Sequence, residues 1–365
     1  MLNNNYYCVL MAGGSGDKIW PWSRENKPKQ FASTAPGKIT MLRRAYDLCL
    51  RLVPKENIIV STLERYRPIV KEILPEIQEN NMLLEPIGKH TAPCTVYAAY
   101  SIYKRNKDAV ITMFPADSIM ENDEKTLTTM QEAMVYAGEH DVLLALGVIP
   151  TRPETQFGYI QVTGGKEARD AGLPAPVKTF TEKPDEDIAR AFCDSGEFFW
   201  NSGIYMWKAS IIKSECEELM PSITTLFEGW ETAIDTPAER SFINKAYTEC
   251  PKLSIDYGLM EKTGRAWIFP IKFRWTALDN WDEFYEVAPK ADDAGNICNT
   301  SAYILKDSSK TLVLSENRGK FIALRGLEDF VVIDTDDVLL ICPRNREALN
   351  DISAAIGFPE YEKYR

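Results

Sequence analysis

The stretch "CVLMAGGSGDKIWPWSRENKPKQF", residues 8–31, is the part of the chain that decides its fold. Its apolar start predicts a buried strand over residues 6–12, which runs into the glycine-rich turn "AGGSG" at residues 12–16. A glycine backbone can approach a phosphate closely, because no Cβ stands in the way. The basic residues that follow are Lys18, Arg24, Lys27 and Lys29. The stretch therefore predicts a strand followed by an anion-binding turn, although "AGGSG" matches neither GxxxxGK[ST] nor GxGxxG.

Further along the chain, apolar strands alternate with amphipathic helices. The predicted strands are 57–62, 109–117 and 142–148, and the predicted helices are 39–53 and 91–106, the last with Thr91 as its cap. This alternation predicts a Rossmann-like α/β domain with a mostly parallel, mixed sheet and helices on both faces. Ligands collect at the carboxyl ends of the strands in such sheets, and the glycine turn and Asp117 both follow strand ends.

From about residue 290 the pattern changes to short β runs separated by Asp, Ser, Asn and Gly. The runs "TLVLS", "KFIALRG", "DFVVIDT" and "VLLIC" recur at roughly ten-residue spacing, which is typical of stacked β coils or a small β domain. We therefore expect a large α/β domain over residues 1–289 and a small C-terminal β-rich, β-helix-like domain over residues 290–365.

The composition limits the class of protein. The chain has 365 residues, 45% of them hydrophobic, which is enough for a sizeable core. Its formal net charge of −11 argues against a general nucleic-acid binder, since such proteins cluster positive charge. The chain has no apolar run of 18 or more residues and no signal-like N-terminus, so we expect a cytoplasmic location and no membrane contact.

The cysteines and histidines give little indication of a metal, redox or acid–base site. The eight cysteines form no CxxC pair, so zinc and redox sites are not expected, and reduced, buried cysteines are. Only two histidines, His90 and His140, are present, which leaves a thin supply for histidine-based acid–base catalysis.

The continuation of the opening stretch carries a family resemblance. The glycine turn followed by "WPWSR" and "KPKQF" resembles the signature of nucleotide-sugar pyrophosphorylases, in particular the mannose-1-phosphate guanylyltransferases, and Trp20-Pro21 resembles the guanylyl branch. Further segments match in family order over residues 6–285: "EPIGKHTAPC" (85–94), "PAD" (115–117), "FGYI" (157–160), "FTEKP" (180–184), "WNSGI" (200–204), "SIDYGLMEK" (254–262) and "RWTALDNW" (274–281).

The resemblance implies a GTP-binding enzyme that transfers GMP from GTP to mannose 1-phosphate, giving GDP-mannose and pyrophosphate with Mg²⁺ as cofactor. The attacking phosphate is already ionised, so no general base is needed, and positioning with charge neutralisation suffices. The chain resembles the short form without an isomerase domain, so no isomerase activity is expected. The resemblance also favours a homodimer formed through the β-rich tail.

The same resemblance assigns roles to residues at matching positions. The implied catalytic residues are Lys18, Lys29 and Asp117; the nucleotide-binding residues are Ala12, Gly13, Gly14, Ser15, Gly16, Glu85, Thr91 and Ala92; the sugar-phosphate-binding residues are Gly158, Tyr159, Glu182, Lys183, Asn201, Gly203 and Asp256; and the metal ligands are Asp117 and Asp279. Taken singly, many have a plainer explanation, such as a strand-end cap for Asp117 or a weak surface pair for Glu182 and Lys183. Their shared order favours the functional interpretation.

Departures from the family pattern fall on the nucleotide and metal side. The usual Thr-Arg after the glycine turn is Asp17-Lys18, and the second metal-binding Asp is replaced by Ala277. Asp279 lies two residues further on, and along an extended strand that shift moves a side chain by about 6.6–7 Å, so reaching the metal requires a bulge or loop. Three hypotheses follow: a mannose-1-phosphate guanylyltransferase with a modified metal site, a guanylyltransferase for another sugar 1-phosphate, and a catalytically impaired paralogue that binds a sugar phosphate or sugar nucleotide in a regulatory role.

Overall fold

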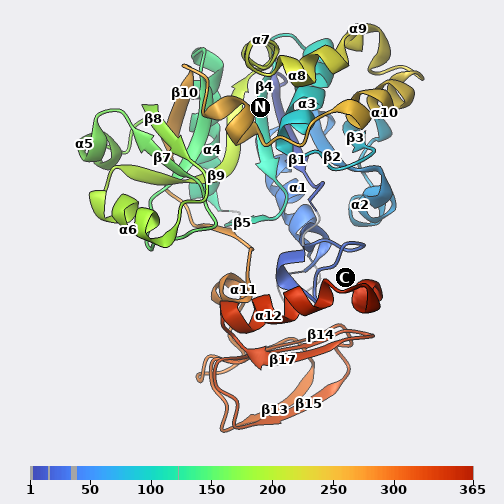
Figure 1. The fold of residues 1–365 in the computed structure, drawn as a ribbon, viewed down its shortest axis with the longest axis vertical. Coiled ribbons are helices and arrows are strands. Elements are labelled where there is room, and N and C mark those ends of the chain that lie inside the picture. The colour runs from blue at the N-terminus through green and yellow to red at the C-terminus, as the bar shows by residue number, and fades with distance from the viewer. Residues whose placement is uncertain (1–2, 15–16, 34–38, 122, 365) are drawn as a thin grey trace. The chain divides into compact units, whose positions relative to one another are not determined.

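A computed structural model of the chain describes residues 3–14, 17–33, 39–121 and 123–364 (Figure 1). Within these ranges the chain forms two compact units, and each is described by itself. Unit 1 comprises Met1–Gly14, Ala45–Ala116 and Met120–Trp275, and unit 2 comprises Ser15–Arg44, Asp117–Ile119 and Thr276–Arg365. The division of the sequence at residue 289 stays a prediction.

Unit 1 is built on a mixed sheet. Among the described residues nine strands pair in the order β3-β2-β1-β4-β9-β6-β10-β8-β7. Their bounds are β1 Tyr6–Met11, β2 Ile58–Leu63, β3 Met82–Glu85, β4 Val110–Pro115, β6 Leu143–Val148, β7 Tyr159–Val162, β8 Ala175–Thr181, β9 Phe198–Lys208 and β10 Ala266–Pro270. Strands β3, β2, β1 and β4 are parallel, whereas β9 runs antiparallel to both β4 and β6. The Rossmann-like, mixed sheet predicted from the alternation is therefore present.

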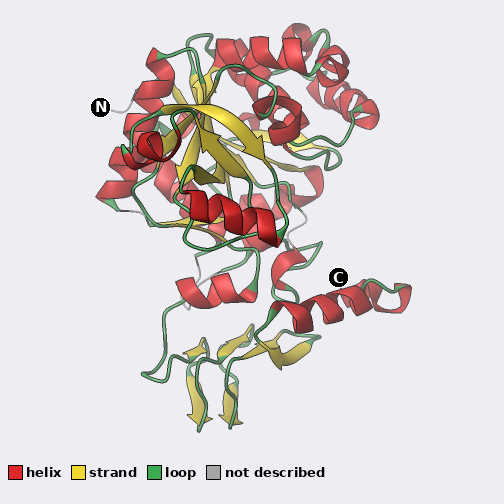
Figure 2. Ribbon diagram, turned by 60° about the vertical axis from the view of Figure 1, so that its left-hand side comes forward, coloured by secondary structure: helices red, strands yellow, loops and turns green. Residues whose placement is uncertain are grey.

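Helices cover both faces of this sheet (Figure 2). The helices are α1 Met41–Leu52, α2 Arg67–Ile73, α3 Thr91–Arg105, α4 Glu124–Glu139, α5 Gly165–Asp170, α6 Glu186–Ser195, α7 Ala209–Leu219, α8 Pro221–Thr224, α9 Trp230–Ala233 and α10 Glu239–Glu249. Every residue of β2 is buried, as expected for a parallel strand with both faces covered. No described helix is long and apolar enough to cross a membrane. The eight cysteines are free, and all except Cys193 are buried.

The predicted cap of α3 is wrong. His90, not Thr91, occupies the N-cap position, and its side chain makes no capping hydrogen bond. Thr91 is the first helical residue, and its hydroxyl accepts a hydrogen bond from the backbone N–H of Ile255 at 2.9 Å. The N–H of Ala92 in the first turn donates instead to the carbonyl of Leu253 at 3.0 Å, so an acceptor remote in sequence serves this helix end.

Unit 2 contains the β-rich tail. Strands β12 Ile297–Cys298, β14 Leu312–Ser315, β16 Phe330–Asp334 and β17 Leu339–Pro343 form one sheet, and β13 Ala302–Lys306 and β15 Phe321–Arg325 form another. The parallel pairs β12–β14, β14–β16 and β13–β15 give the stacked coils that the sequence predicted. Helices α11 Trp281–Val287 and α12 Arg346–Ile356 complete the unit. The short strands β5 Ser118–Met120 and β11 Trp275–Ala277 lie where the chain passes from one unit to the other.

Candidate functional site

The glycine turn follows β1 and lies against β2 and β3. The N–H of Ala12 donates to the carbonyl of Ser61 at 2.7 Å, and the hydroxyl of Thr62 donates to the carbonyl of Ala12 at 2.8 Å. A Cβ placed on Gly13 would lie 3.4 Å from Oε1 of Glu85, so the turn passes directly beside this carboxyl group. Glycine is compatible with this close approach. Ser15 and Gly16 lie outside the described residues.

Glu85 is the buried acid of this region. It is 4% exposed at the end of β3, and the hydroxyl of Ser61 donates to its Oε1 at 3.2 Å. Burial raises the pKa of Glu85 to about 7, against the lowering effect of hydrogen bonds such as the one from Ser61. Near neutral pH the carboxyl group can therefore hold or release a proton, and it sits beside the backbone expected to meet the nucleotide.

A second cluster in unit 1 gathers around Asp256. Nδ2 of Asn201 donates to Oδ1 of Asp256 at 3.0 Å and to the hydroxyl of Tyr205 at 2.8 Å, and the Tyr205 hydroxyl donates to the same Oδ1. Asp256 begins η7, Asp256–Met260, a π-helical turn of the kind that often marks functional sites. Tyr205 is not among the residues that the sequence motifs indicated. Its signal was the period-2 spacing along β9, which places Asn201 and Tyr205 on one face.

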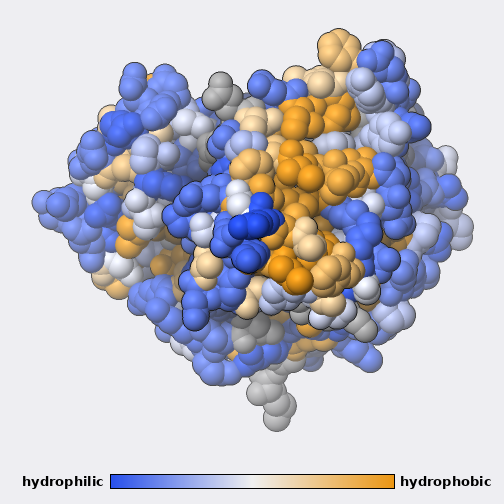
Figure 3. Space-filling model, turned by 90° about the horizontal axis from the view of Figure 1, so that it is seen from below, coloured by the Kyte–Doolittle hydropathy of each residue, from blue (hydrophilic) through white to orange (hydrophobic). Residues whose placement is uncertain are grey.

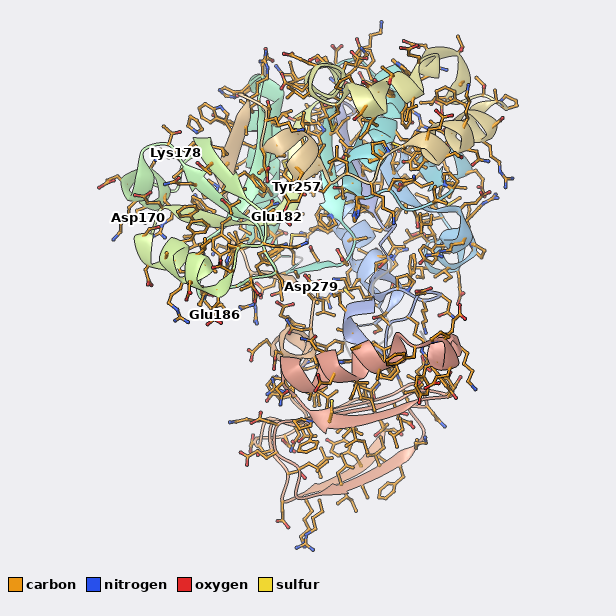
Figure 4. All side chains as sticks on the ribbon, viewed as in Figure 1. Asp170, Lys178, Glu182, Glu186, Tyr257 and Asp279 are labelled. Atoms are coloured by element: carbon orange, nitrogen blue, oxygen red, sulfur yellow. The ribbon has the colours of Figure 1, made fainter. Side chains whose placement is uncertain are left out.

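Glu182, which follows β8, faces the same cluster. Burial raises the pKa of Glu182 to about 7, and the charge of Asp256 adds to this effect although Lys183 opposes it. Oε2 of Glu182 is buried, and no hydrogen-bond partner for it exists among the described residues. Figure 4 shows Glu182 and Tyr257 on the same side of unit 1. The unpartnered oxygen is what a hydroxyl-bearing ligand would satisfy.

Glycine stands at two positions of this cluster for different physical reasons. A Cβ on Gly158 would lie 2.4 Å from Oε2 of Glu182, so glycine here leaves room for that carboxylate. Gly203 has φ +72°, a left-handed conformation that favours glycine, and its N–H donates to Oδ1 of Asn201 at 3.0 Å. Both glycines thus shape the positions of the polar side chains. Direct approach of a sugar to the Gly158 backbone stays a prediction.

The side chain of Tyr159 packs in the core beside this cluster. Its side chain is fully buried, and its hydroxyl accepts a hydrogen bond from the N–H of Glu154 at 2.9 Å. It packs beside Phe192 and Phe198, with ring centroids 5.4 and 6.5 Å away. The side chain of Tyr159 is therefore a core side chain, and a ligand contact through its backbone stays a prediction.

Unit 2 brings three other predicted residues together. Nζ of Lys29 lies 3.0 Å from Oδ2 of Asp117 and 2.5 Å from Oδ1 of Asp279, and it donates to the carbonyl of Leu278 at 3.0 Å. Lys29 is in η2, Lys29–Phe31, and its side chain is 6% exposed. Burial lowers its pKa, but the charges of Asp117 and Asp279 outweigh burial and raise the pKa above the usual range. Lys29 is therefore a permanent cation held between two carboxylates.

The sequence did not show whether Asp279 could lie beside Asp117, and the structure places it there. Strand β11 ends at Ala277, so the chain has left the extended geometry before Asp279, as the required loop rearrangement demands. The N–H of Asp279 donates to Oε2 of Glu283 at 2.7 Å, which holds this turn at the start of α11. Two carboxylates that converge on one cation form an oxygen-donor set suited to Mg²⁺, which one or two protein carboxylates bind together with substrate phosphates. The described residues contain no larger cluster of three His, Cys, Asp or Glu side chains.

Contacts with the C-terminal part of the chain hold the segment that carries Lys29. Nη2 of Arg24 lies 2.5 Å from Oδ1 of Asp337, and Nε1 of Trp20 donates to the carbonyl of Tyr364 at 2.7 Å. Lys18 lies exposed in η1, Asp17–Ile19, and the side chain of Asp17 is outside the described part. The β-rich tail and residues 17–33 are thus parts of one unit, which the sequence patterns did not indicate.

The comparisons with known proteins agree over nearly the whole chain. Residues 7–294 match the nucleotidyl transferase family, and residues 301–348 match the MannoseP isomerase/GMP-like beta-helix domain. The mannose-1-phosphate guanylyltransferases of Klebsiella pneumoniae and Escherichia coli are each 33% identical over 366 residues, which cover 98% of this chain and 76% of each relative. The crystal structure of mannose-1-phosphate geranyltransferase from Thermus thermophilus superposes with a TM-score of 0.81 at 26% identity, covering 97% of this chain and 100% of that one.

Proposed function

This chain belongs to the nucleotidyl transferase family, in the branch of the mannose-1-phosphate guanylyltransferases, and we propose that it transfers GMP from GTP to mannose 1-phosphate. The observation that carries the proposal is the convergence of Lys29, Asp117 and Asp279, which come from three separate segments of the chain. A permanent cation and two carboxylates are the groups that phosphoryl transfer requires for neutralising and positioning phosphates.

The proposed reaction needs no proton transfer by the protein. A phosphate oxygen of mannose 1-phosphate attacks the α-phosphorus of GTP, the bond between the α- and β-phosphates breaks, and pyrophosphate leaves with its electron pair. Lys29 meets phosphate as a point charge, and the backbone of the glycine turn provides N–H donors to the nucleotide. Glu182, Asn201 and Asp256 bind the hydroxyls of the sugar, which would satisfy the unpartnered oxygen of Glu182.

Asp117 and Asp279 would hold Mg²⁺ in this proposal, with Lys29 turning toward phosphate. The metal would supply positive charge against the triphosphate. The carboxylate at position 279 thus compensates for Ala277, and for this reason we do not favour the catalytically impaired paralogue.

We also keep three predictions about the whole protein: a cytoplasmic location, no nucleic-acid partner, and a homodimer formed through the β-rich tail. Apolar side chains gather over the C-terminal strands when these are seen from below (Figure 3). The exposed ones are Tyr303, Ile304, Phe321, Leu339 and Ile341, on β13, β15 and β17. Their exposure supports a covering partner such as a second copy.

The experiment for the proposed function is product identification by ³¹P NMR. GTP, Mg²⁺ and the protein are mixed with mannose 1-phosphate or, in parallel, with glucose 1-phosphate and fucose 1-phosphate. We expect resonances of GDP-mannose and pyrophosphate to grow in equal amounts with mannose 1-phosphate. Equal or faster turnover of another sugar phosphate would move the assignment to that sugar, and no pyrophosphate with any of them would refute transfer.

A further inference from the structure

Two segments of unit 1, residues 89–92 and residues 253–255, are tied together by three hydrogen bonds. The N–H of Leu253 donates to the carbonyl of Lys89 at 3.2 Å, and the N–H of Ala92 donates to the carbonyl of Leu253 at 3.0 Å. The third bond is the one from the N–H of Ile255 to the hydroxyl oxygen of Thr91, at 2.9 Å. The segment expected to bind the nucleotide is thus fastened to a turn that belongs to the sugar-phosphate cluster.

The Thr91 bond ends next to a predicted ligand-binding side chain. Ile255 is 2% exposed and directly precedes Asp256, the first residue of η7. A buried N–H that loses its acceptor is costly, so the hydroxyl of Thr91 fixes the backbone from which Asp256 extends. Asp256 in turn accepts hydrogen bonds from Asn201 and Tyr205.

The backbone beside Thr91 indicates that this connection is strained. His90 has φ +64° and ψ −166°, a combination that residues other than glycine rarely adopt. Such a conformation persists only where surrounding contacts over-determine it. The two backbone bonds that Leu253 makes, one donated to Lys89 and one accepted from Ala92, flank His90 and supply those contacts.

We propose that Thr91 is a positioning residue for the sugar-phosphate site, acting through the Ile255 N–H on Asp256, rather than a direct nucleotide ligand. The proposal rests on the proposed function for the identity of the ligand, mannose 1-phosphate. The anchoring of the backbone before Asp256 by the Thr91 hydroxyl does not depend on which sugar phosphate binds.

The test compares Thr91→Val, which keeps the shape and removes the acceptor, with Thr91→Ser, which restores the acceptor. Thr129→Val is the control for the loss of a threonine hydroxyl, because the Thr129 hydroxyl donates to the carbonyl of Lys125 on α4, outside both segments. Hydrogen–deuterium exchange of the protein without ligand is measured over residues 198–206 and 253–260. Binding of mannose 1-phosphate and of GTP, each alone, is measured by calorimetry.

We expect Thr91→Val to speed exchange in both peptides and to weaken mannose 1-phosphate binding by about five- to tenfold, the loss of one acceptor for a buried N–H. GTP binding should change less than about twofold, and Thr91→Ser should behave like the parent protein. Unchanged exchange would overturn the proposal, as would a variant that weakens GTP binding and spares mannose 1-phosphate. If the parent protein releases no pyrophosphate from GTP and mannose 1-phosphate, the proposed function fails, and the exchange data still decide the role of Thr91.

Discussion

The buried carboxyl group of Glu85 should make the stability of the protein fall as the pH rises. In the folded chain its pKa is about 7, against an ordinary value of 4.5. The folded state therefore keeps the proton over a range in which the unfolded chain releases it. The stabilisation is fully present below pH 4.5 and is lost progressively as the pH rises through 7.

The size of the effect follows from this difference. From pH 5.5 to 7 the unfolded chain is ionised and the folded one is not, and 1.5 pH units at 1.36 kcal/mol each give about 2 kcal/mol. Glu85→Gln replaces the carboxyl group by a neutral group of the same shape and abolishes this dependence. The free energy of unfolding of the parent should thus fall by about 2 kcal/mol relative to Glu85→Gln between pH 5.5 and 8.5.

The assay is urea unfolding followed by far-ultraviolet circular dichroism at several pH values within that range. Glu132→Gln, a change at an exposed position of α4, is the control and should give a difference from the parent that does not depend on pH. The explanation would be refuted if the difference between the parent and Glu85→Gln were constant across the range, since the carboxyl group would then titrate alike in both states.

Four further substitutions probe the two clusters. Gly158→Ala should cost less than about 1 kcal/mol of stability, because the carboxylate of Glu182 can swing aside, yet it should weaken sugar-phosphate binding; calorimetry showing parental affinity would contradict this. Lys29→Met should lower kcat/KM for pyrophosphate release by about 10²-fold or more. A smaller loss would show that Lys29 is not a catalytic residue. Asp279→Asn should abolish the Mg²⁺-dependent rate, whereas Ala277→Asp should raise the rate by no more than a few-fold; a large gain from Ala277→Asp would show that Asp279 does not compensate.

Local patterns predicted most of the fold. The strand before the glycine turn, the alternating helices and strands, and the β coils of the tail all have sequence periods that report burial directly. The same local reasoning failed at Thr91, because the acceptor role of its hydroxyl depends on Ile255, which lies 164 residues away in sequence. At Tyr159 the structure shows a side chain packed in the core, which the motif alone did not indicate.

Some features of the candidate site could likewise be predicted from local motifs, and others could not. The motifs located Lys29, Asp117, Glu182 and Asn201, but only the structure shows that Asp279 lies against the Lys29 ammonium. That outcome depends on where β11 ends, and strand ends are set by tertiary contacts as much as by residue type. The union of residues 17–33 and 39–44 with the C-terminal tail in one unit has no local signature either.

The most direct test of guanylyl transfer is the initial rate of pyrophosphate release from GTP and mannose 1-phosphate with Mg²⁺, measured beside Lys29→Met at equal concentration. The convergence of Lys29, Asp117 and Asp279 predicts sustained turnover that requires both substrates and the metal, and a rate near background for the variant. A parent protein that binds GDP-mannose but releases pyrophosphate no faster than the variant would contradict it.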